Sequence, residues 1–414
     1  MDRRQFLKGA AAFASLAAFS RLTLASSSFT SEQYWVFINA QGGWDTTSIC
    51  DPKGNIEFSA NHGVINRYNQ SDIRQVGNFK LAPMLTSSYS GPDHMATFFS
   101  QQQAYLRVFN GLDFATNSHD AGMRASLTGS HSASYPTSAA IIASLNKEQY
   151  LMPYYLAVGY GNTAGLVNAS RLDNLSRLQD FTNPDRFLPS SVTDAINQRN
   201  QQKLDSMSDS TVDAELQAIS DYRSAHANGS DLKRLQDRLP TSPSSDYMKM
   251  RAEITAASFA AELSNTASMG FGSFDTHSNN DEKQAYQIAY LFEVVNHLIS
   301  ELERQGIADK TNIVIGSDFG RTPYYNPDNG KDHWNVGSMM IWSKQSSGNL
   351  QIGATDNQVN ALAVDPNTLE TSENGVILTP GHLHLAIRQK MGIDENNHIS
   401  FQFPLGMNFV DVLG

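Results

Sequence analysis

The sequence predicts an α/β fold with a mostly parallel central sheet and a helical insertion, on three observations. Near-continuous apolar runs at residues 34–40 and 312–316 are typical of strands buried on both faces of a sheet. An amphipathic run at 282–305 lies between the segment 268–277 and the strand at 312–316, which gives a strand–helix–strand unit with parallel pairing. Residues 172–264 combine polar residues with spaced Leu, Ile and Ala, which predicts the added helices.

Each expected element has a local reason. The strand at 34–40 stops before the glycine pair Gly42-Gly43, which permits a tight turn. Glycine also ends the two expected helices of the sheet layers, since Gly306 follows 282–305 and Gly392 follows 380–390. Further strands are expected at 104–109 and 156–158, and helices of the insertion at 193–207, 211–227 and 245–263.

Length and charge restrict the class of protein. A chain of 414 residues is long enough for one large α/β domain with insertions or for two domains, and one domain over residues 26–414 is the interpretation adopted here. The net charge of −11 argues against nucleic acid and anionic membrane surfaces as partners. Cys50 is the single cysteine, so no disulfide can form within the chain.

The first 25 residues have the order of an export signal. Arg3-Arg4 precedes a mildly apolar, alanine-rich run at 9–19, and Thr23-Leu24-Ala25 offers small residues for cleavage. The alternative is an amphipathic N-terminal helix. We expect a twin-arginine signal peptide over 1–25, and therefore a folded protein exported to the periplasm or beyond. No later run is long and apolar enough for a transmembrane helix.

Acidic and histidine side chains follow the expected strands. Asp45 comes after the first strand, Asp275 and His277 after the segment that begins at 268, and Asp318 after the strand at 312–316. The carboxyl edge of a parallel sheet is where α/β enzymes place their sites. Carboxylates and imidazoles there predict a divalent metal, although a turn or helix cap is the alternative for any one aspartate.

These motifs resemble a known family. Gly43-Trp44-Asp45, Phe274–His277, Ser317–Thr322 and Asp332-His333 are similar to those of the exported domain-of-unknown-function 1501 family, within the alkaline phosphatase and sulfatase superfamily. The resemblance implies a three-layer alkaline-phosphatase-like sandwich. It also implies that Asp45, Asp275, His277, Asp318 and His333 are metal ligands or ligands plus a catalytic base. We expect Asp332 to orient His333 rather than to be a ligand itself.

The chain departs from the superfamily in two places. Phe319 stands where the superfamily has a histidine ligand, so one of the usual two metals is missing or held differently. The spacing to the helix at Arg124 places Asp120 where the nucleophile is expected, which excludes formylglycine chemistry. The candidate nucleophile is then Ser118, Thr116, Thr46 or Thr47, and His119 is a candidate ligand or general base. Arg321 would bind a tetrahedral anion or, alternatively, orient Asp318.

Two functions are therefore predicted, from different classes. The first is an exported hydrolase of phosphate or sulfate esters that uses a metal-activated nucleophile, with Zn²⁺ or with Ca²⁺, Mg²⁺ or Mn²⁺ as the ion. Its substrate would be an anionic small molecule or glycan. The second is a non-catalytic binding or assembly protein on a degenerate hydrolase fold, which the missing nucleophile and Phe319 favour.

Overall fold

The computed structural model describes residues 33–84, 91–172, 229–393 and 410–413, together with isolated residues between 173 and 228. All of these belong to the unit Gln33–Gly414, the larger of the two into which the chain divides. The centre of this unit is an eight-stranded sheet in the order β14-β6-β13-β10-β1-β9-β7-β8. Its strands are β1 (Tyr34–Ala40), β6 (Leu106–Asp113), β7 (Tyr154–Leu156), β8 (Ala169–Ser170), β9 (Thr266–Phe271), β10 (Thr311–Ser317), β13 (Val336–Ser343) and β14 (Leu350–Ile352).

Strand β1 lies between β9 and β10, and both neighbours run parallel to it. Phe37 of β1 pairs with Val314 of β10 and with Ser268 of β9. Every residue of β1 and β10 is buried, which explains why both segments are continuous apolar runs. Helix α10 (Asn280–Arg304) connects β9 to β10. The predicted strands at 34–40 and 312–316, the helix at 282–305 and the parallel pairing are confirmed.

Strand β13 is the exception in a mostly parallel sheet. It runs antiparallel to both β10 and β6, whereas the other pairs in the sheet are parallel. The strand expected at 104–109 begins at Leu106 and continues to Asp113. The strand expected at 156–158 lies slightly earlier, at Tyr154–Leu156. The predicted fold class, α/β with a mostly parallel central sheet, is confirmed.

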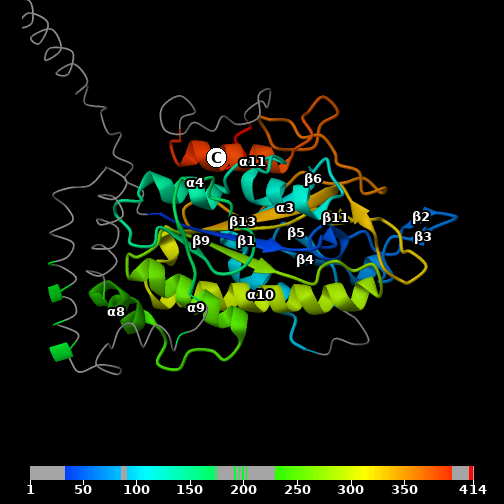
Figure 1. Ribbon diagram of the computed structural model, residues 1–414. Helices are drawn as coiled ribbons and strands as arrows, with labels where there is room; N and C mark the ends of the chain where they lie inside the picture. The colour runs from blue at the N-terminus through cyan, green and yellow to red at the C-terminus, as the bar shows by residue number, and fades with distance from the viewer. Residues whose placement is uncertain are drawn as a thin grey trace, which may run out of the picture. The chain divides into compact units, whose positions relative to one another are not determined.

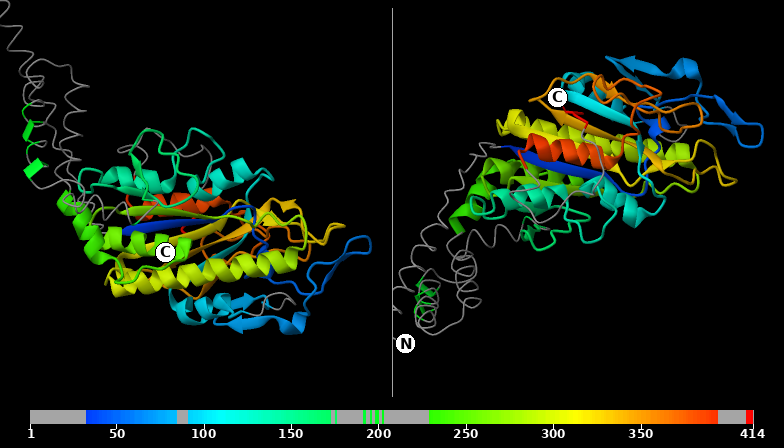
Figure 2. Two further views of the ribbon diagram at one scale, coloured as in Figure 1. Left: turned by 60° about the horizontal axis from the view of Figure 1, so that its bottom comes forward. Right: turned by 90° about the horizontal axis from the view of Figure 1, so that it is seen from above.

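Helices cover both faces of the sheet (Figures 1 and 2). Alternate residues of β1 point to opposite sides, so Ile38 packs in one core with Phe292 of α10, and Phe37 packs in the other with Ile387. The result is a three-layer sandwich. One outer layer contains α10, α9 (Tyr247–Ala260) and α2 (His94–Gln102), and the other contains α3 (His119–Thr128), α4 (Ser138–Leu145) and α11 (Pro380–Lys390).

Short elements surround the sheet. The antiparallel pair of β11 (Gly320–Arg321) and β12 (His333–Trp334) places Arg321 opposite His333. Two further ribbons are formed by β2 (Glu57–Ser59) with β3 (Gly63–Val64) and by β4 (Arg74–Val76) with β5 (Phe79–Leu81). The 3-10 helices are η1 (Thr46–Ser48), η2 (Gln70–Asp72), η3 (Gln103–Tyr105) and η5 (Ala308–Lys310).

Most of the expected insertion at 172–264 lies outside the described residues, including the helices expected at 193–207 and 211–227. Its described part forms α8 (Gly229–Arg238) and α9, and α9 matches the helix expected at 245–263. Phe259 of α9 belongs to the same core as α10, so this helix is part of the sheet's outer layer. The signal at 1–25 is also outside the described residues. Among the helices that are described, none has the length and apolar character needed to cross a membrane.

Candidate metal centre

Two loops, one helix start and one short strand meet near the carboxyl edge of the sheet. Because β1, β9 and β10 are parallel, their carboxyl ends lie at the same edge. Asp275 and His277 follow β9, and Asp318 follows β10. His119 is the first residue of α3, and His333 lies on β12. The structure thus brings together side chains that are far apart in the sequence.

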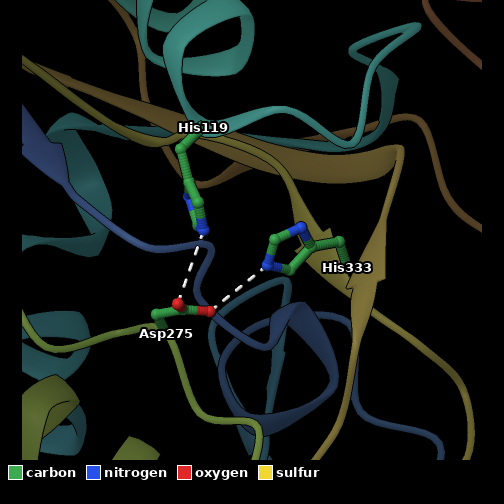
Figure 3. A group of neighbouring side chains, drawn as sticks. All are labelled: His119, Asp275 and His333. Carbon is green, nitrogen blue, oxygen red and sulfur yellow. Dashed lines mark hydrogen bonds and ion pairs between the residues drawn. The ribbon is translucent and has the colours of Figure 1, made fainter.

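Three histidines surround the carboxylate of Asp275, and we call His119, His277 and His333 with Asp275 the histidine cluster. The Oδ1 atom of Asp275 lies 3.0 Å from Nε2 of His277 and 3.3 Å from Nε2 of His333. Its Oδ2 atom lies 3.5 Å from Nε2 of His119. Figure 3 shows His119 and His333 approaching the two oxygens of the carboxylate from different elements. Ligand atoms of His119, Asp275 and His333 all lie within 4.8 Å of one another.

Each imidazole of the cluster is held through its Nδ1 atom by an acceptor. Nδ1 of His119 lies 3.0 Å from Oδ2 of Asp318, and Nδ1 of His277 lies 2.7 Å from Oδ1 of Asp332. Nδ1 of His333 lies 2.8 Å from the carbonyl oxygen of Asn117. Carbonyl and ionised carboxylate oxygens only accept, so each Nδ1 carries the proton and donates. In the neutral rings, all three Nε2 atoms therefore present lone pairs.

Two of these Nε2 atoms are in contact. Nε2 of His277 lies 3.0 Å from Nε2 of His333. Two lone pairs at this distance repel unless a proton or a metal ion lies between them, and the adjacent charge of Asp275 favours a cation there. Nε2 of His119 is buried without a hydrogen-bond partner among the described residues. The ligand atoms of His119, His333 and Asp275 lie close enough together for one ion, and Nε2 of His277 adjoins two of them. Imidazole nitrogens with a carboxylate suit Zn²⁺, and each ring is oriented from behind by an acceptor.

Asp275 is held in place by Arg321. Nη2 of Arg321 donates to Oδ1 of Asp275 at 2.7 Å. Burial alone would raise the pKa of Asp275, but the hydrogen bond and charge of Arg321 outweigh it and lower the pKa. Asp275 is therefore a carboxylate at neutral pH, with nearly half of its side chain exposed to solvent.

Arg321 has a different role from either of those predicted. Its guanidinium is fully buried and donates to the carbonyl oxygens of Gly43, Lys331, Gly42 and Phe274, besides Asp275. No nitrogen is left facing solvent to bind a tetrahedral anion, and the ion pair is with Asp275 rather than Asp318. Arg321 fixes the loops of the site to one another.

Asp318 holds the ring of His119 and is not among the residues whose ligand atoms lie close together. It is buried, and its Oδ1 accepts from Nδ2 of Asn39 at 3.0 Å. Its Oδ2 accepts from the amide of Gly42 at 2.8 Å as well as from His119. That hydrogen bond is the main reason why the pKa of His119 is raised. The expected ligand is thus an acceptor behind His119.

Asp332 orients a histidine, but not the one expected. Its Oδ1 accepts from Nδ1 of His277 and, at 3.1 Å, from Nδ2 of Asn326. His333 is held by a backbone carbonyl instead. Burial acts to raise the pKa of Asp332, but the hydrogen bonds from His277 and Asn326 and the charges of His277 and Arg321 together lower it. The sequence predicted that Asp332 orients its neighbour His333, whereas the loop places Asp332 against His277.

Asp45, also expected as a ligand, is enclosed by protein groups. Its Oδ1 accepts from the amide and hydroxyl of Thr47, and its Oδ2 accepts from Ser48, Asn280 and Nζ of Lys331. Asp45 and Lys331 are buried, with their charged atoms 2.8 Å apart. Burial would raise the pKa of Asp45, but Lys331 keeps it below the ordinary value. The structure pairs Asp45 with an internal cation.

The candidate nucleophile region contributes only His119. Ser118 and Asp120 are exposed, and their side chains make none of the hydrogen bonds or ion pairs of the histidine cluster within the described part of the chain. Phe319, at the expected position of a histidine, is fully buried between His119 and His333, with ring centroids at 4.9 and 4.6 Å. It packs the two imidazoles instead of supplying a ligand.

Sequence reasoning missed Lys331 and the acceptor at Asn117. A lysine in a polar loop ordinarily points into water, and nothing in the local pattern of Gly330-Lys331-Asp332 marks it as buried. The carbonyl of Asn117 gives no sequence signal, since any residue carries one. Gln284 and Asn280, which hydrogen bond to Asp45, lie on the buried face of α10. In the sequence they are recognisable only as polar residues among the apolar residues of that face.

The chain has a low level of similarity to several solved structures. Its TM-score is 0.39 against the crystal structure of Ps i-CgsB in complex with k-i-k-neocarrahexaose, with 10% identity over 92% of this chain and 75% of that one. It is 0.38 against the lipoteichoic acid synthase LtaP from Listeria monocytogenes, with 8% identity over 89% and 74%. It is 0.36 against the C-terminal periplasmic domain of EcEptC from Escherichia coli in complex with Zn, with 10% identity over 77% and 75%.

A search of curated proteins gave no match. Residues 33–402 match the family described as "Protein of unknown function (DUF1501)". The match spans the sheet, its covering helices and every residue of the histidine cluster. The chain belongs to the DUF1501 family.

Proposed function

We propose that this protein is an exported, metal-dependent hydrolase of phosphate or sulfate esters. The observation that carries the proposal is the convergence of three imidazole Nε2 atoms on the carboxylate of Asp275, each ring held by an acceptor at Nδ1. A divalent ion bound there would supply a Lewis acid and lower the pKa of water. His119, His277, His333 and Asp275 would hold the ion, and Asp318 and Asp332 would orient two of the histidines.

The donor set favours one class of ion. Three imidazole nitrogens and one carboxylate suit Zn²⁺, whereas Ca²⁺ and Mg²⁺ prefer sites built from oxygens. Of the ions predicted from the sequence, Zn²⁺ is therefore the first choice and Mn²⁺ the second. The metal-ligand role proposed for Asp45 and Asp318 is replaced by the roles described above.

An anionic ester group suits the surroundings of the site. Asp275 and His277 are each exposed by nearly half, so a substrate can reach the cluster from solvent. His119 begins α3, and the first amides of a helix lack intrahelical acceptors and carry a partial positive charge. With Arg321 buried, binding of a phosphate or sulfate group would fall to this helix start and to the bound ion. The substrate class is an anionic small molecule or glycan.

Export is part of the proposal and rests on the sequence. The arginine pair, apolar run and small-residue site at 1–25 would direct a folded protein through the twin-arginine route. The mature domain would then begin near residue 26, with the helical segment 172–264 inserted within it.

Three residues support the second predicted function, a non-catalytic binding or assembly protein. Arg321 and Asp45 are both paired with internal partners, and the side chain of Ser118 makes no hydrogen bond with the cluster among the described residues. A non-catalytic binding or assembly protein that retains its metal would have this arrangement. It differs from the hydrolase in lacking any group that attacks the ester.

Metal content tests the proposal. Wild-type protein, Asp275→Asn and His277→Ala are purified without chelator and measured by inductively coupled plasma mass spectrometry. His62→Ala is the matched control, since His62 is exposed on the β2–β3 turn outside the cluster. We expect a stoichiometric divalent ion in wild type and control, lost in the two cluster variants. A wild-type protein still metal-free after incubation with Zn²⁺, Mn²⁺, Mg²⁺ and Ca²⁺ contradicts the proposal.

Activity then separates the two functions. The metal-loaded protein is assayed with p-nitrophenyl phosphate and p-nitrophenyl sulfate, followed by sulfated and phosphorylated oligosaccharides. Hydrolysis that Asp275→Asn abolishes supports the enzyme. Stoichiometric metal without hydrolysis of any ester favours the binding protein.

A further inference from the structure

We propose that Lys331 is a positioning residue, whose buried ion pair with Asp45 sets the metal affinity of the histidine cluster. The inference rests on the proposed metal site and concerns a residue outside the ligand set. Nζ of Lys331 lies 2.8 Å from Oδ2 of Asp45 and 3.2 Å from Oγ1 of Thr47. It also lies 5.1 Å from the ring centre of Tyr325. The side chain of Lys331 has no exposed surface, so the ammonium group is entirely enclosed by the protein.

The backbone of Lys331 connects the two loops that carry the ligands. Its amide donates to the carbonyl oxygen of Thr276 at 3.1 Å, and Thr276 lies between Asp275 and His277. Its own carbonyl accepts from Nη1 of Arg321 at 2.9 Å. His333 is two residues further along the chain. A displacement of Lys331 would therefore move both loops relative to each other.

The side chain of Lys331 connects the two loops to the sheet through Asp45. Asp45 caps η1, directly after the turn that follows β1, and its amide donates to Oε1 of Gln284 at 3.0 Å. Nε2 of Gln284 donates in turn to Oγ1 of Thr276 at 3.1 Å. The ion pair is thus the charged member of a buried network that ties the end of β1 and helix α10 to the loop of Asp275 and His277.

The loops have no room to adjust independently. A Cβ atom added at Gly330 would lie 2.0 Å from the carbonyl carbon of His277, so the backbone next to Lys331 packs directly on the backbone of a ligand. Loss of the anchoring charge would leave its partner unpaired in a closed interior, which destabilises the present positions of the loops. Movement of Lys331 then displaces Nε2 of His277 from Nε2 of His333, and metal affinity falls.

The test compares zinc dissociation constants, measured by competition with a chromophoric chelator well below the unfolding temperature. Lys331→Met and Asp45→Asn are each expected to weaken binding by about 10–100-fold, the range found for residues that orient ligands. The double variant is expected to be no weaker than either single variant, because the two residues act as one unit. Lys53→Met is the matched control. It breaks the ion pair of Lys53 with Asp51, which is also largely buried but has no contact with the ligand loops among the described residues.

The outcomes separate this inference from the proposed function. Wild-type affinity in Lys331→Met overturns the role of Lys331 and leaves the metal site intact. A wild-type protein that binds no zinc overturns the metal site itself. Equal weakening in Lys53→Met and Lys331→Met means that general destabilisation is responsible, which also overturns the inference. If Lys331→Met does not fold, zinc affinity is measured in the double variant Lys331→Met, Asp45→Asn, which buries no unpaired charge. Wild-type affinity in that variant likewise overturns the inference.

Discussion

Nε2 of His277 and Nε2 of His333 lie 3.0 Å apart, and both face Oδ1 of Asp275. Each ring uses its Nδ1 proton elsewhere, His277 toward Asp332 and His333 toward the carbonyl of Asn117. The contact is therefore stable only with a positive charge between the two rings.

The acceptor behind His277 should control metal affinity. Asp332→Asn keeps the shape of the side chain but removes the charge that fixes the Nδ1 proton of His277, so we expect zinc affinity to fall by about 10–100-fold. The measurement is a chelator competition. Asp328→Asn, an exposed substitution in the same loop, is the control and should bind as wild type does. Unchanged affinity in Asp332→Asn would contradict the assigned tautomer.

Zinc should stabilise the folded protein. An ion that binds only the folded state at about 100 times its dissociation constant adds about 2.7 kcal/mol to the free energy of unfolding. We expect a higher midpoint of thermal unfolding with zinc than with chelator in the wild-type protein. Asp275→Asn, which lacks the central carboxylate charge, should unfold at the same temperature in both conditions. A zinc-dependent rise of equal size in this variant would place the binding site elsewhere.

Gly122 should be required for the position of His119. A Cβ atom at Gly122 would lie 2.1 Å from the backbone oxygen of Asp318, so the glycine lets α3 approach the end of β10. Alanine ordinarily favours a helix by about 1 kcal/mol over glycine. Here we expect Gly122→Ala to lower the free energy of unfolding by about 1–3 kcal/mol through overpacking, and to weaken zinc binding.

Gly272→Ala is the control for that substitution. A Cβ atom at Gly272 meets no atom within 4 Å, although the residue lies in the loop that leads to Asp275. Denaturant unfolding and zinc competition should both give wild-type values. A Gly122→Ala protein as stable as this control would show that α3 does not press on β10.

The buried His384 should make stability depend on pH. Its burial lowers the pKa to about 4, and its two nitrogens lie 2.7 Å from Oγ of Ser138 and 2.9 Å from the carbonyl of Ser126. The unfolded chain, with a histidine pKa of about 6.5, binds more protons between the two values. The free energy of unfolding therefore falls as the pH drops from about 6.5 to about 4, by up to about 3 kcal/mol from this residue.

His384→Gln removes the titrating group and should flatten this part of the profile. The measurement is denaturant unfolding of both proteins at several values of pH across the window. His382, which lies in the first turn of the same helix and is also buried, serves for comparison as His382→Gln. Parallel profiles for the wild type and His384→Gln would show that His384 is protonated as easily in the folded protein as in the unfolded chain.

The fold was predictable where burial leaves a pattern. The strands β1 and β10 are buried on both faces, so their apolar composition identifies them. The buried residues of α10 recur at the helical period, which identifies the helix. Strand β13 also has an apolar sequence, VGSMMIWS, but its place between β6 and β10 depends on sheet order, which no local pattern encodes. The family was predictable because several short motifs occur in the right order along the chain.

The site was predictable only by residue type. Asp275 and His277 were identified as candidates because they follow a strand, and His333 and His119 through the motifs and spacing of the family that the chain resembles. Their roles depend on partners that are distant in sequence. Lys331 forms an ion pair with Asp45, Arg321 with Asp275, and Asp332 with His277. The residues next to each of them in the sequence do not predict these pairs.

The hydrogen bond between His119 and Asp318 joins residues 199 positions apart, and β1, which lies between β9 and β10, comes from the start of the described chain. Contacts of such long range form late, because a long loop must close before they stabilise anything. The zinc site should therefore exist only once the sheet is complete. Zinc uptake during refolding can be monitored by stopped-flow fluorescence. We expect it to coincide with the final step of folding and to be absent from partly folded intermediates.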